Sequence, residues 1–271
     1  MKSTIVKKAV ILAGGRGTRM KEEIEGLELD EKSRELAEKG LKGLIPIDEQ
    51  GKCFLDYSLD RLINSGYEQV CFVVSPEHDD FKKHFIGNKK VKFAIQDKPL
   101  GTSDAIYAAR DFVGNDNFVV LNGDNLYSEH VLQKLRESNG DVCCCPGYDQ
   151  EGLIRKSKID IRRVKKWAVM KTDENWFLKE IEENSEKREN YVVGKKIIIS
   201  MNVFRFTPEI FVACKNINLS KKGEYEIASA LQYGIDKLGM KVKVFYVNEG
   251  VFDLTSRTDI KIVREVLKNG R

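Results

Sequence analysis

The chain lacks the features that mark membrane-spanning, secreted and cysteine-ligated metal proteins. No apolar run approaches the roughly 20 residues that cross a membrane, so we expect no transmembrane helix. The opening MKSTIVK has no signal-peptide core, and no two cysteines have CxxC spacing. We read the cysteines as buried, reduced thiols of a cytoplasmic protein rather than as a redox site. They are Cys53, Cys71, Cys143, Cys144, Cys145 and Cys214.

The chain also has no large excess of charge of one sign. A net charge of +4 is too small to indicate nucleic-acid or membrane binding, although it suits an anionic substrate. With 41% hydrophobic and 32% charged residues, the composition is that of a globular protein with a sizeable core. We expect one domain over residues 1–271, built from a first half (1–150) and a second half (151–271).

Short apolar runs alternate with helical patterns through the first half of the chain. Strands joined by helices at this spacing form βαβ units, so we expect a Rossmann-like α/β fold with a mainly parallel sheet. Ligands of such sheets bind beyond the carboxyl ends of the strands. The expected strands are residues 9–13, 70–75, 91–96, 117–124 and 141–148, and the expected helices are residues 54–65, 103–113 (N-cap Thr102 or Ser103) and 128–140 (closed by Gly140).

The second half of the chain differs from the first in charge and in the pattern of its expected strands. Residues 155–166 are strongly basic, and residues 167–184 read as an antiparallel hairpin with a polar turn. One long strand is expected at 197–206 and another at 241–248, followed by a terminal helix from residue 259. These elements predict that the second half extends the sheet and adds a small antiparallel part.

The stretch LAGGRGTRM (residues 12–20) places three glycines and two arginines directly after an expected buried strand. It lacks the third glycine of a dinucleotide-binding GxGxxG motif and the GK[ST] end of a P-loop, so both interpretations are weak. The N–H groups of a glycine turn still form an anion-binding nest, and Arg19 would grip a phosphate with two hydrogen bonds. A plain turn needs no arginines, so the stretch favours a phosphate site.

Two further loops at strand ends carry polar residues. In QDKPLGTSD (residues 96–104), Gln96 can donate and accept in one plane, as reading a nucleobase edge requires, and Gly101 allows close backbone approach. Taken alone, this loop reads as an ordinary βα connection. Asp124 ends LNGD and Asp253 follows another apolar stretch. Two such carboxylates suit a shared Mg²⁺ ion, and two capping aspartates are the alternative.

Several blocks of the chain resemble, in order, the nucleotide-sugar pyrophosphorylases. These are the sugar-1-phosphate nucleotidyltransferases, such as the glucose-1-phosphate thymidylyl- and uridylyltransferases. The resemblance implies a GT-A-like nucleotidyltransferase fold, Mg²⁺ as cofactor, and conversion of an NTP and a sugar 1-phosphate to an NDP-sugar and pyrophosphate. It implies no nucleic-acid or membrane partner and is compatible with a homo-oligomer. The blocks are LAGGRGTRM, LKGLIPI, QDKPLGTSDAI, LNGDNLY, SMNVFRF, GEYEIASAL and GVFDLTSRTD.

The resemblance also implies roles for individual residues. Arg19 and Lys42 would hold the departing pyrophosphate and balance charge at the α-phosphate, while Asp124 and Asp253 would ligate the metal. A sugar phosphate oxygen is already nucleophilic at neutral pH, so alignment and charge stabilisation suffice and no Ser-His-Asp set is needed. The nucleotide-binding positions, all in the first half, would be Leu12, Ala13, Gly14, Gly15, Gly17, Thr18, Gln96, Leu100, Gly101, Thr102, Asn122 and Gly123.

The second half, the expected sugar-binding half, departs from the family pattern. Glu182 and Asn202 fall near the family's sugar-contacting positions. However, EEN at residues 182–184 stands where the family often has EKP, so the lysine that touches the sugar phosphate is absent. Either Lys179 or Lys195 substitutes for it, or the acceptor is not an ordinary hexose 1-phosphate.

Three further points stay open. The segment 21–40, with twelve charges in twenty positions, reads as a solvated helical excursion and is compatible with a mobile lid. UTP or dTTP with glucose 1-phosphate is favoured, with GTP and mannose 1-phosphate, or CTP and another phosphorylated acceptor, as alternatives. A non-catalytic regulatory protein on the same fold, and nucleic-acid binding through residues 155–166, are the competing functions.

Overall fold

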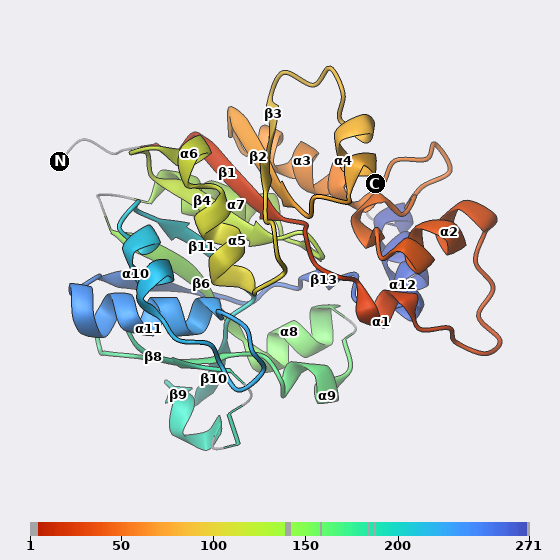
Figure 1. Cartoon of the computed structure of the whole chain (residues 1–271). Helices are drawn as coiled ribbons and strands as arrows, with labels where there is room; N and C mark the ends of the chain where they lie inside the picture. The colour runs from red at the N-terminus through yellow and green to blue at the C-terminus, as the bar shows by residue number, and fades with distance from the viewer. Residues whose placement is uncertain (1–4, 139–141, 158, 184, 187, 270–271) are drawn as a thin grey trace.

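The computed structural model describes residues 5–138, 142–157, 159–183, 185–186 and 188–269 (Figure 1). Among these residues, a mixed eleven-stranded sheet forms the centre of the molecule, and a two-stranded sheet pairs β13 with β5. The strands are β1 (Lys8–Leu12), β2 (Gln69–Val74), β3 (Val91–Ile95), β4 (Phe118–Asn122), β5 (Asn125–Leu126), β6 (Cys143–Asp149), β7 (Val169–Thr172), β8 (Leu178–Glu182), β9 (Val192–Val193), β10 (Lys196–Ile199), β11 (Val203–Phe206), β12 (Val242–Val247) and β13 (Phe252–Asp253).

The large sheet has the order β3-β2-β1-β4-β11-β6-β10-β7-β8, with β12 beside β6 and β9 beside β10. Strands β3, β2, β1 and β4 are parallel to one another, as β12 is to β6. Strand β11 is antiparallel to both β4 and β6 and so joins the two halves of the chain in one sheet. The predicted mixed sheet with an antiparallel extension is confirmed, including the β7–β8 hairpin.

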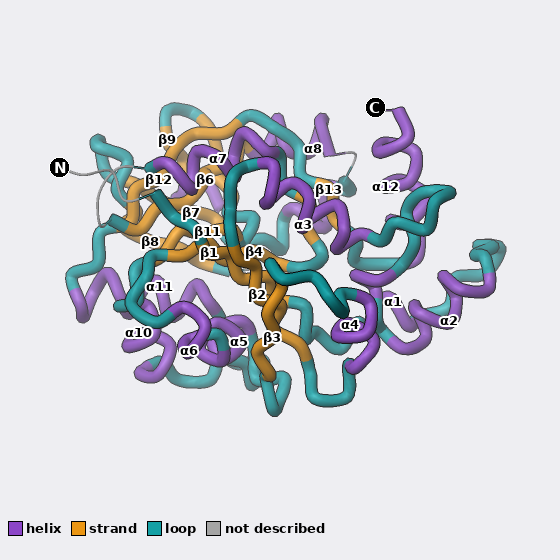
Figure 2. The backbone as a smooth tube through the Cα atoms, turned by 90° about the horizontal axis from the view of Figure 1, so that it is seen from above, coloured by secondary structure: helices purple, strands orange, loops and turns teal. Residues whose placement is uncertain are grey.

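Helices cover both faces of this sheet, which lies between them in the view from above (Figure 2). Strand side chains alternate between faces, so neighbouring residues of β2 enter different cores. Phe72 packs in the core beneath α3, α4 and α7, whereas Cys71 and Val73 pack beneath α5, α10 and α11. The helices are α1 (Thr18–Lys21), α2 (Glu31–Lys39), α3 (Phe54–Asn64), α4 (Asp79–His84), α5 (Thr102–Ala108), α6 (Arg110–Val113), α7 (Glu129–Glu137), α8 (Gln150–Ser157), α9 (Ile161–Val164), α10 (Ile210–Asn216), α11 (Ile227–Leu238) and α12 (Arg257–Asn269), with short 3₁₀ turns at Lys42–Leu44 and Arg188–Tyr191.

The charged segment 21–40 is helical over α2 and packs against the C-terminal helix α12 (Figure 1). Asp30 caps α2 by accepting a hydrogen bond from the backbone N–H of Ser33 at 2.8 Å. Arg264 of α12 donates to both of these residues, at 3.0 Å to the Asp30 carboxylate and 2.8 Å to the Ser33 hydroxyl. The segment is therefore anchored on one side and is not a fully solvated excursion.

Two predicted elements are wrong in detail. The single strand expected at 197–206 is two strands, β10 and β11, because the backbone turns at Asn202, which has φ 53°. The single helix expected at 103–113 is α5 followed by α6, and neither Thr102 nor Ser103 is its N-cap. Gly101 is the N-cap, and the Thr102 hydroxyl instead accepts a hydrogen bond from the Ile227 N–H at 2.9 Å.

Smaller predictions have mixed outcomes. The helix expected at 128–140 ends at Glu137, and Gly140, its expected closing residue, lies outside the described residues. All six cysteines are buried and unpaired, as predicted. In the described part of the chain, no helix combines the length and apolarity needed to cross a membrane.

Candidate functional site

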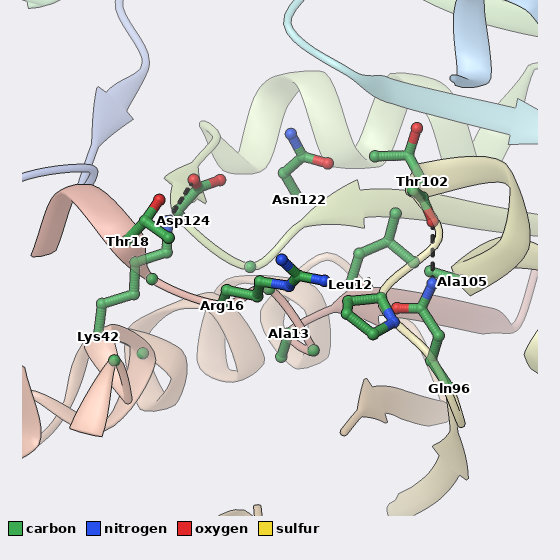
Figure 3. Close-up of a pocket in the computed structure, with 18 of the residues that line it drawn as sticks. Leu12, Ala13, Arg16, Thr18, Lys42, Gln96, Thr102, Ala105, Asn122 and Asp124 are labelled. Carbon is green, nitrogen blue, oxygen red and sulfur yellow. Dashed lines mark hydrogen bonds and ion pairs between the residues drawn. The ribbon is translucent and has the colours of Figure 1, made fainter. Parts of the chain in front are cut away.

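A cavity of about 520 Å³ lies at the carboxyl ends of β1, β3 and β4 (Figure 3). The parallel register pairs Leu12 with both Val73 and Asn122, so the loops after β1 and β4 leave the sheet at the same level. The structure thus gathers segments that are distant in sequence. Of the predicted site residues, those that line the cavity are Leu12, Ala13, Gly14, Gly15, Gly17, Thr18, Lys42, Gln96, Leu100, Gly101, Thr102, Asn122, Gly123 and Asp124.

The glycine turn leaves β1 and packs against the end of segment 21–40. Gly17 has φ 60°, and a Cβ atom on it would lie 2.6 Å from the carbonyl oxygen of Gly40. In return, a Cβ on Gly40 would lie 2.6 Å from the carbonyl oxygen of Arg16. Within the described chain, the backbone N–H groups of Gly14, Gly15 and Arg16 have no hydrogen-bond acceptor. They are therefore available to an anion such as a phosphate group.

Gln96 lies on the opposite wall, with its amide group fixed by two acceptors. Its Nε2 donates to the Gly101 carbonyl at 3.0 Å and to the Asp104 carboxylate at 2.9 Å. Because a carbonyl and a carboxylate only accept, both amide hydrogens are used and only Oε1 remains for a ligand. The prediction that Gln96 both donates to and accepts from a base is therefore wrong in its donor half. The side chain is 6% exposed and can act only as an acceptor.

Lys42 and Asp124 form an ion pair at the other end of the cavity. The Lys42 ammonium is 2.7 Å from the Asp124 carboxylate, and the two side chains are about one-fifth exposed. Burial alone would raise the pKa of Asp124, but the charges of Lys42 and Arg19 outweigh it and hold that pKa below its usual value. The Asp124 carboxylate is therefore ionised at neutral pH, with the positive charges of Lys42 and Arg19 nearby.

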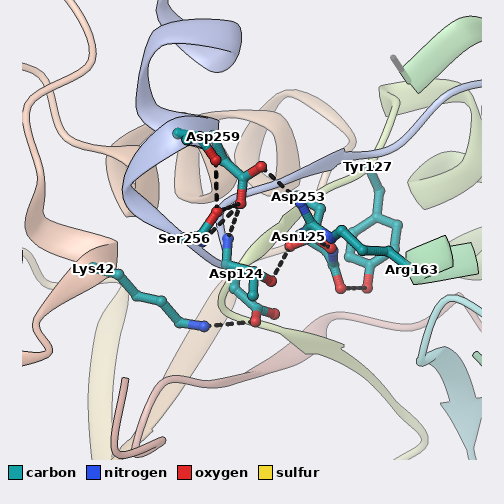
Figure 4. A network of polar contacts seen from close by, with 10 residues as sticks. Lys42, Asp124, Asn125, Tyr127, Arg163, Asp253, Ser256 and Asp259 are labelled. Atoms are coloured by element: carbon teal, nitrogen blue, oxygen red, sulfur yellow. Dashed lines mark hydrogen bonds and ion pairs between the residues drawn. The ribbon is translucent and has the colours of Figure 1, made fainter. Parts of the chain in front are cut away.

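Asp253 lies beside Asp124 because β13 pairs with β5 (Figure 4). The Leu254 N–H donates to the Asp124 carbonyl at 2.8 Å, which fixes the two aspartates next to each other. Burial and the charge of Asp124 raise the pKa of Asp253 to about 6, against the opposing charge of Arg163. Arg163, on α9, is 2.7 Å from the Asp253 carboxylate and 2.7 Å from that of Asp259.

These two aspartates fit a hard divalent cation. One carboxylate raises the pKa of the other, which is the electrostatic strain that a bound cation relieves. Oxygen ligands from one or two carboxylates, completed by substrate phosphates and water, are what Mg²⁺ prefers. The ion-pairing groups Lys42 and Arg163 balance the two acids from opposite sides.

Four predicted residues lie outside the cavity lining: Asp253, described above, and three others. Arg19 is exposed on α1, close enough for its charge to lower the pKa of Asp124. Glu182, at the end of β8, accepts a hydrogen bond from the Tyr191 hydroxyl at 2.9 Å and lines a neighbouring groove. Asn202 sits at the turn between β10 and β11, where the Tyr127 hydroxyl donates to the carbonyl of the preceding residue, Met201, at 2.5 Å.

Two cavity-lining features were not predicted from the sequence as site residues. The Arg16 side chain points across the cavity between Asp124 and Gln96 (Figure 3). The loop Lys222–Glu224 closes one side of the cavity, held by a hydrogen bond from the Tyr225 N–H to the Leu100 carbonyl at 2.7 Å. The available signal was the block GEYEIASAL, which begins inside this loop.

Lys222 connects the cavity to the groove that contains Glu182. It lines both spaces and is 2.8 Å from the Glu226 carboxylate and 3.4 Å from that of Glu183. The two substitutes considered for the family's missing lysine are elsewhere. Lys179 pairs with an aspartate of the β7–β8 hairpin at 3.2 Å, and Lys195 lines a different groove.

Comparisons with known proteins agree with this geometry. The profile of the nucleotidyl transferase family matches residues 8–253. The UTP–glucose-1-phosphate uridylyltransferase AglF of Haloferax volcanii is 26% identical over 82% of this chain and 81% of its own. The D-glycero-alpha-D-manno-heptose 1-phosphate guanylyltransferase of Campylobacter jejuni is 28% identical over 72% of this chain and 77% of its own. The match to the bifunctional protein GlmU of Methanococcus vannielii, at 26% identity, spans 85% of this chain but only 50% of that protein.

Solved structures share the fold. A UDP-glucose pyrophosphorylase complexed with UDP-glucose has a TM-score of 0.75 at 16% identity, over 98% of this chain and 100% of that one. A glucose-1-phosphate thymidylyltransferase homologue from Bacillus anthracis has a TM-score of 0.70 at 20% identity, over 97% and 95%. The resemblance inferred from the sequence blocks is confirmed, and the chain belongs to the nucleotidyl transferase family, among its sugar-1-phosphate nucleotidyltransferases.

Proposed function

We propose that this protein transfers a nucleotidyl group from UTP or dTTP to glucose 1-phosphate, giving an NDP-sugar and pyrophosphate. The observation that carries the proposal is the arrangement of the cavity. The cavity is lined by the backbone N–H groups of the glycine turn, by the acceptor oxygen of Gln96, and by the ion pair of Lys42 and Asp124. A nucleotide bound with its base at Gln96 and its phosphates at the glycine turn would extend from one end to the other.

The state of Gln96 fits the favoured bases. Its acceptor oxygen can receive a hydrogen bond from the ring N–H of uracil, thymine or guanine, and also from the exocyclic amino group of cytosine or adenine. Gln96 therefore supports UTP or dTTP without excluding CTP. GTP with mannose 1-phosphate or a related sugar phosphate remains the second candidate, because one relative with the fold is a guanylyltransferase.

In the proposed reaction, a phosphate oxygen of the sugar 1-phosphate attacks the α-phosphorus of the NTP and pyrophosphate leaves. The turn N–H groups and Arg16 would hold the nucleotide phosphates, and Lys42 with Arg19 would stabilise charge at the α-phosphate and on the leaving pyrophosphate. Mg²⁺ held by Asp124 and Asp253 would supply further charge neutralisation at the phosphates. Such a site works by positioning and electrostatics, without a protein base.

We further propose that Lys222 contacts the phosphate of the sugar 1-phosphate. It borders both the nucleotide cavity and the groove of about 680 Å³ that contains Glu182, so it lies where the two substrates would meet. Glu182 and Asn202 would then contact the sugar. Lys222 would then supply the positive charge that a lysine next to the position of Glu182 often supplies in the family.

A matrix of four NTPs plus dTTP against several sugar 1-phosphates, with Mg²⁺ and a pyrophosphate readout, tests the proposal. We expect release with UTP or dTTP and glucose 1-phosphate, and near-complete loss of it in Asp124→Asn. The competing function is a non-catalytic regulator that binds nucleotide on the same fold. No release with any pair, together with nucleotide binding unchanged in Asp124→Ala, would favour that regulator and remove the enzyme proposal.

A further inference from the structure

A second group of ligand-type side chains lies outside the cavity, where α3 begins and α4 ends. Cys53 is the N-cap of α3, Asp56 is the third residue of that helix, and His84 is the last residue of α4. One ligand atom from each, a sulfur, a carboxylate oxygen and a ring nitrogen, lie within 4.8 Å of one another. The spacing of Cys53 and Asp56, three residues apart at the helix start, places both on the side that faces His84.

The three groups are linked by hydrogen bonds, and Asp56 also belongs to the capping box of α3, in which its carboxylate accepts from the Cys53 N–H at 2.8 Å. His84 Nε2 is 2.9 Å and 3.1 Å from the two carboxylate oxygens of Asp56 and 3.5 Å from the sulfur of Cys53. A ring nitrogen has either one hydrogen or one lone pair, so Nε2 cannot bond fully to the carboxylate and to the thiol at once. A cation placed between the three atoms would accept electrons from all of them.

The distances between the ligand atoms identify the class of ion. Zinc bonds of about 2.3 Å to sulfur and about 2.0 Å to nitrogen and oxygen, at tetrahedral angles, place sulfur and nitrogen about 3.5 Å apart and nitrogen and oxygen about 3.3 Å apart. The observed separations are 3.5 Å and 2.9–3.1 Å, so the imidazole and carboxylate need open by only a few tenths of an ångström. Mg²⁺ and Ca²⁺ take oxygen ligands and would not use the sulfur.

We propose that Cys53, Asp56 and His84 bind one zinc-class divalent ion, with its fourth position open to water. The His84 and Asp56 side chains are 34% and 23% exposed, so an ion can reach them from solvent, whereas Cys53 is buried at the base of the site. The His84 ring is held edge-on against Phe85, with ring centroids 4.7 Å apart, which limits its rotation. Binding requires loss of the thiol proton, which the metal displaces.

The ion would join two helices that form a wall of the nucleotide cavity. Leu55, between the two α3 ligands, and Phe81, three residues before His84, both line that cavity. Without the metal, the link between the two helices at this point is the pair of Asp56 and His84. A metal bond across it would hold the wall in one position, so the site is structural and independent of the proposed reaction.

Titration of the full chain with Co²⁺, monitored by absorption, tests the site because a cobalt–thiolate bond gives a charge-transfer band in the near ultraviolet. We expect the band to saturate at one equivalent, to be removed by Zn²⁺, and to be lost in His84→Ala and Cys53→Ser. Matched controls at His130→Ala, Cys214→Ser and Asp124→Asn should keep it. His84 is near the surface, so His84→Ala should fold, which circular dichroism checks.

A second readout is thermal stability. The three ligand atoms come together only in the folded chain. Zn²⁺ should therefore raise the Tm of the wild type and leave that of His84→Ala unchanged. A wild type that gives no thiolate band at excess Co²⁺, or a band that persists in His84→Ala, would overturn the proposal. Either outcome leaves the proposed nucleotidyl transfer untouched, since that is measured separately by pyrophosphate release.

Discussion

Replacement of Lys222 by methionine tests where the sugar phosphate binds. Methionine keeps most of the length of the side chain and removes its charge. The Lys222 side chain is 54% exposed, but the side chains of its partners Glu183 and Glu226 are only 23% and 15% exposed, so removal of the lysine leaves two partly buried carboxylates close together. The cost to folding should therefore exceed the roughly 0–1 kcal/mol of a fully exposed ion pair. The proposed contact of Lys222 with a phosphate is a charge-assisted hydrogen bond, worth about 1.5–3 kcal/mol. That range corresponds to a loss of roughly 10- to 150-fold in kcat/KM.

The assay is steady-state pyrophosphate release with each substrate varied in turn. We expect KM for the sugar 1-phosphate to rise while KM for the NTP stays within about twofold, and circular dichroism at the assay temperature should show that the variant is folded. Lys221→Met is the matched control, since Lys221 lines the outer groove and not the cavity. An increase confined to the NTP KM, or an equal effect of both variants, would refute the placement of the sugar phosphate at Lys222.

Four further substitutions examine other parts of the site. Gly101→Ala should destabilise the fold by about 1–3 kcal/mol in urea and weaken nucleotide binding, because Gly101 has φ 111° and an added Cβ would lie 2.7 Å from the backbone facing it; wild-type stability would contradict this. Asp104→Asn should raise the KM for the NTP by roughly tenfold, since the Gln96 amide is no longer held by a charge-assisted bond and its acceptor oxygen is less well aligned; an unchanged KM would argue against a base-reading role. Arg19→Ala should lower kcat with little change in Tm, whereas Arg16→Ala, in the cavity lining, should mainly raise the NTP KM; a reversal of the two effects would exchange their roles.

The parts of the site that the sequence predicts best are those at strand ends. Leu12, Asn122 and Gln96 each follow a short apolar run, and parallel strands bring their carboxyl ends to one edge of a sheet. Asp124 and Asp253 are brought together differently, through a two-residue pairing of β5 with β13. Periodicity carries no signal for such a short contact. The residue types alone left a shared Mg²⁺ ion and two capping aspartates as alternatives, and the resemblance to a family favoured the shared ion.

The features that the sequence misses depend on long-range contacts of loops. Lys222 lies in a loop whose position is fixed by backbone hydrogen bonds to the loop after β3, and nothing in its own sequence points to the cavity. The turn at Asn202 is another example, because a left-handed conformation is uncommon outside glycine and the surrounding residues are strongly apolar. Gln96 lines the cavity as predicted but has a restricted function, because Gly101 and Asp104 accept its two amide hydrogens.

The contact between Gly17 and Gly40 has an evolutionary consequence. The segment between these residues leaves the edge of the sheet and returns to almost the same point. The contact between its two ends, and not its length, therefore sets the shape of the glycine turn. Doubling the length of a flexible loop closed in this way costs only about 0.6 kcal/mol. Insertions and deletions in the loop that joins α1 to α2 should therefore be tolerated, whereas changes at the start of α2 would break its hydrogen bonds to Arg264. A change in the length of that loop should leave the glycine turn unaltered, since the contact between Gly17 and Gly40 sets its shape.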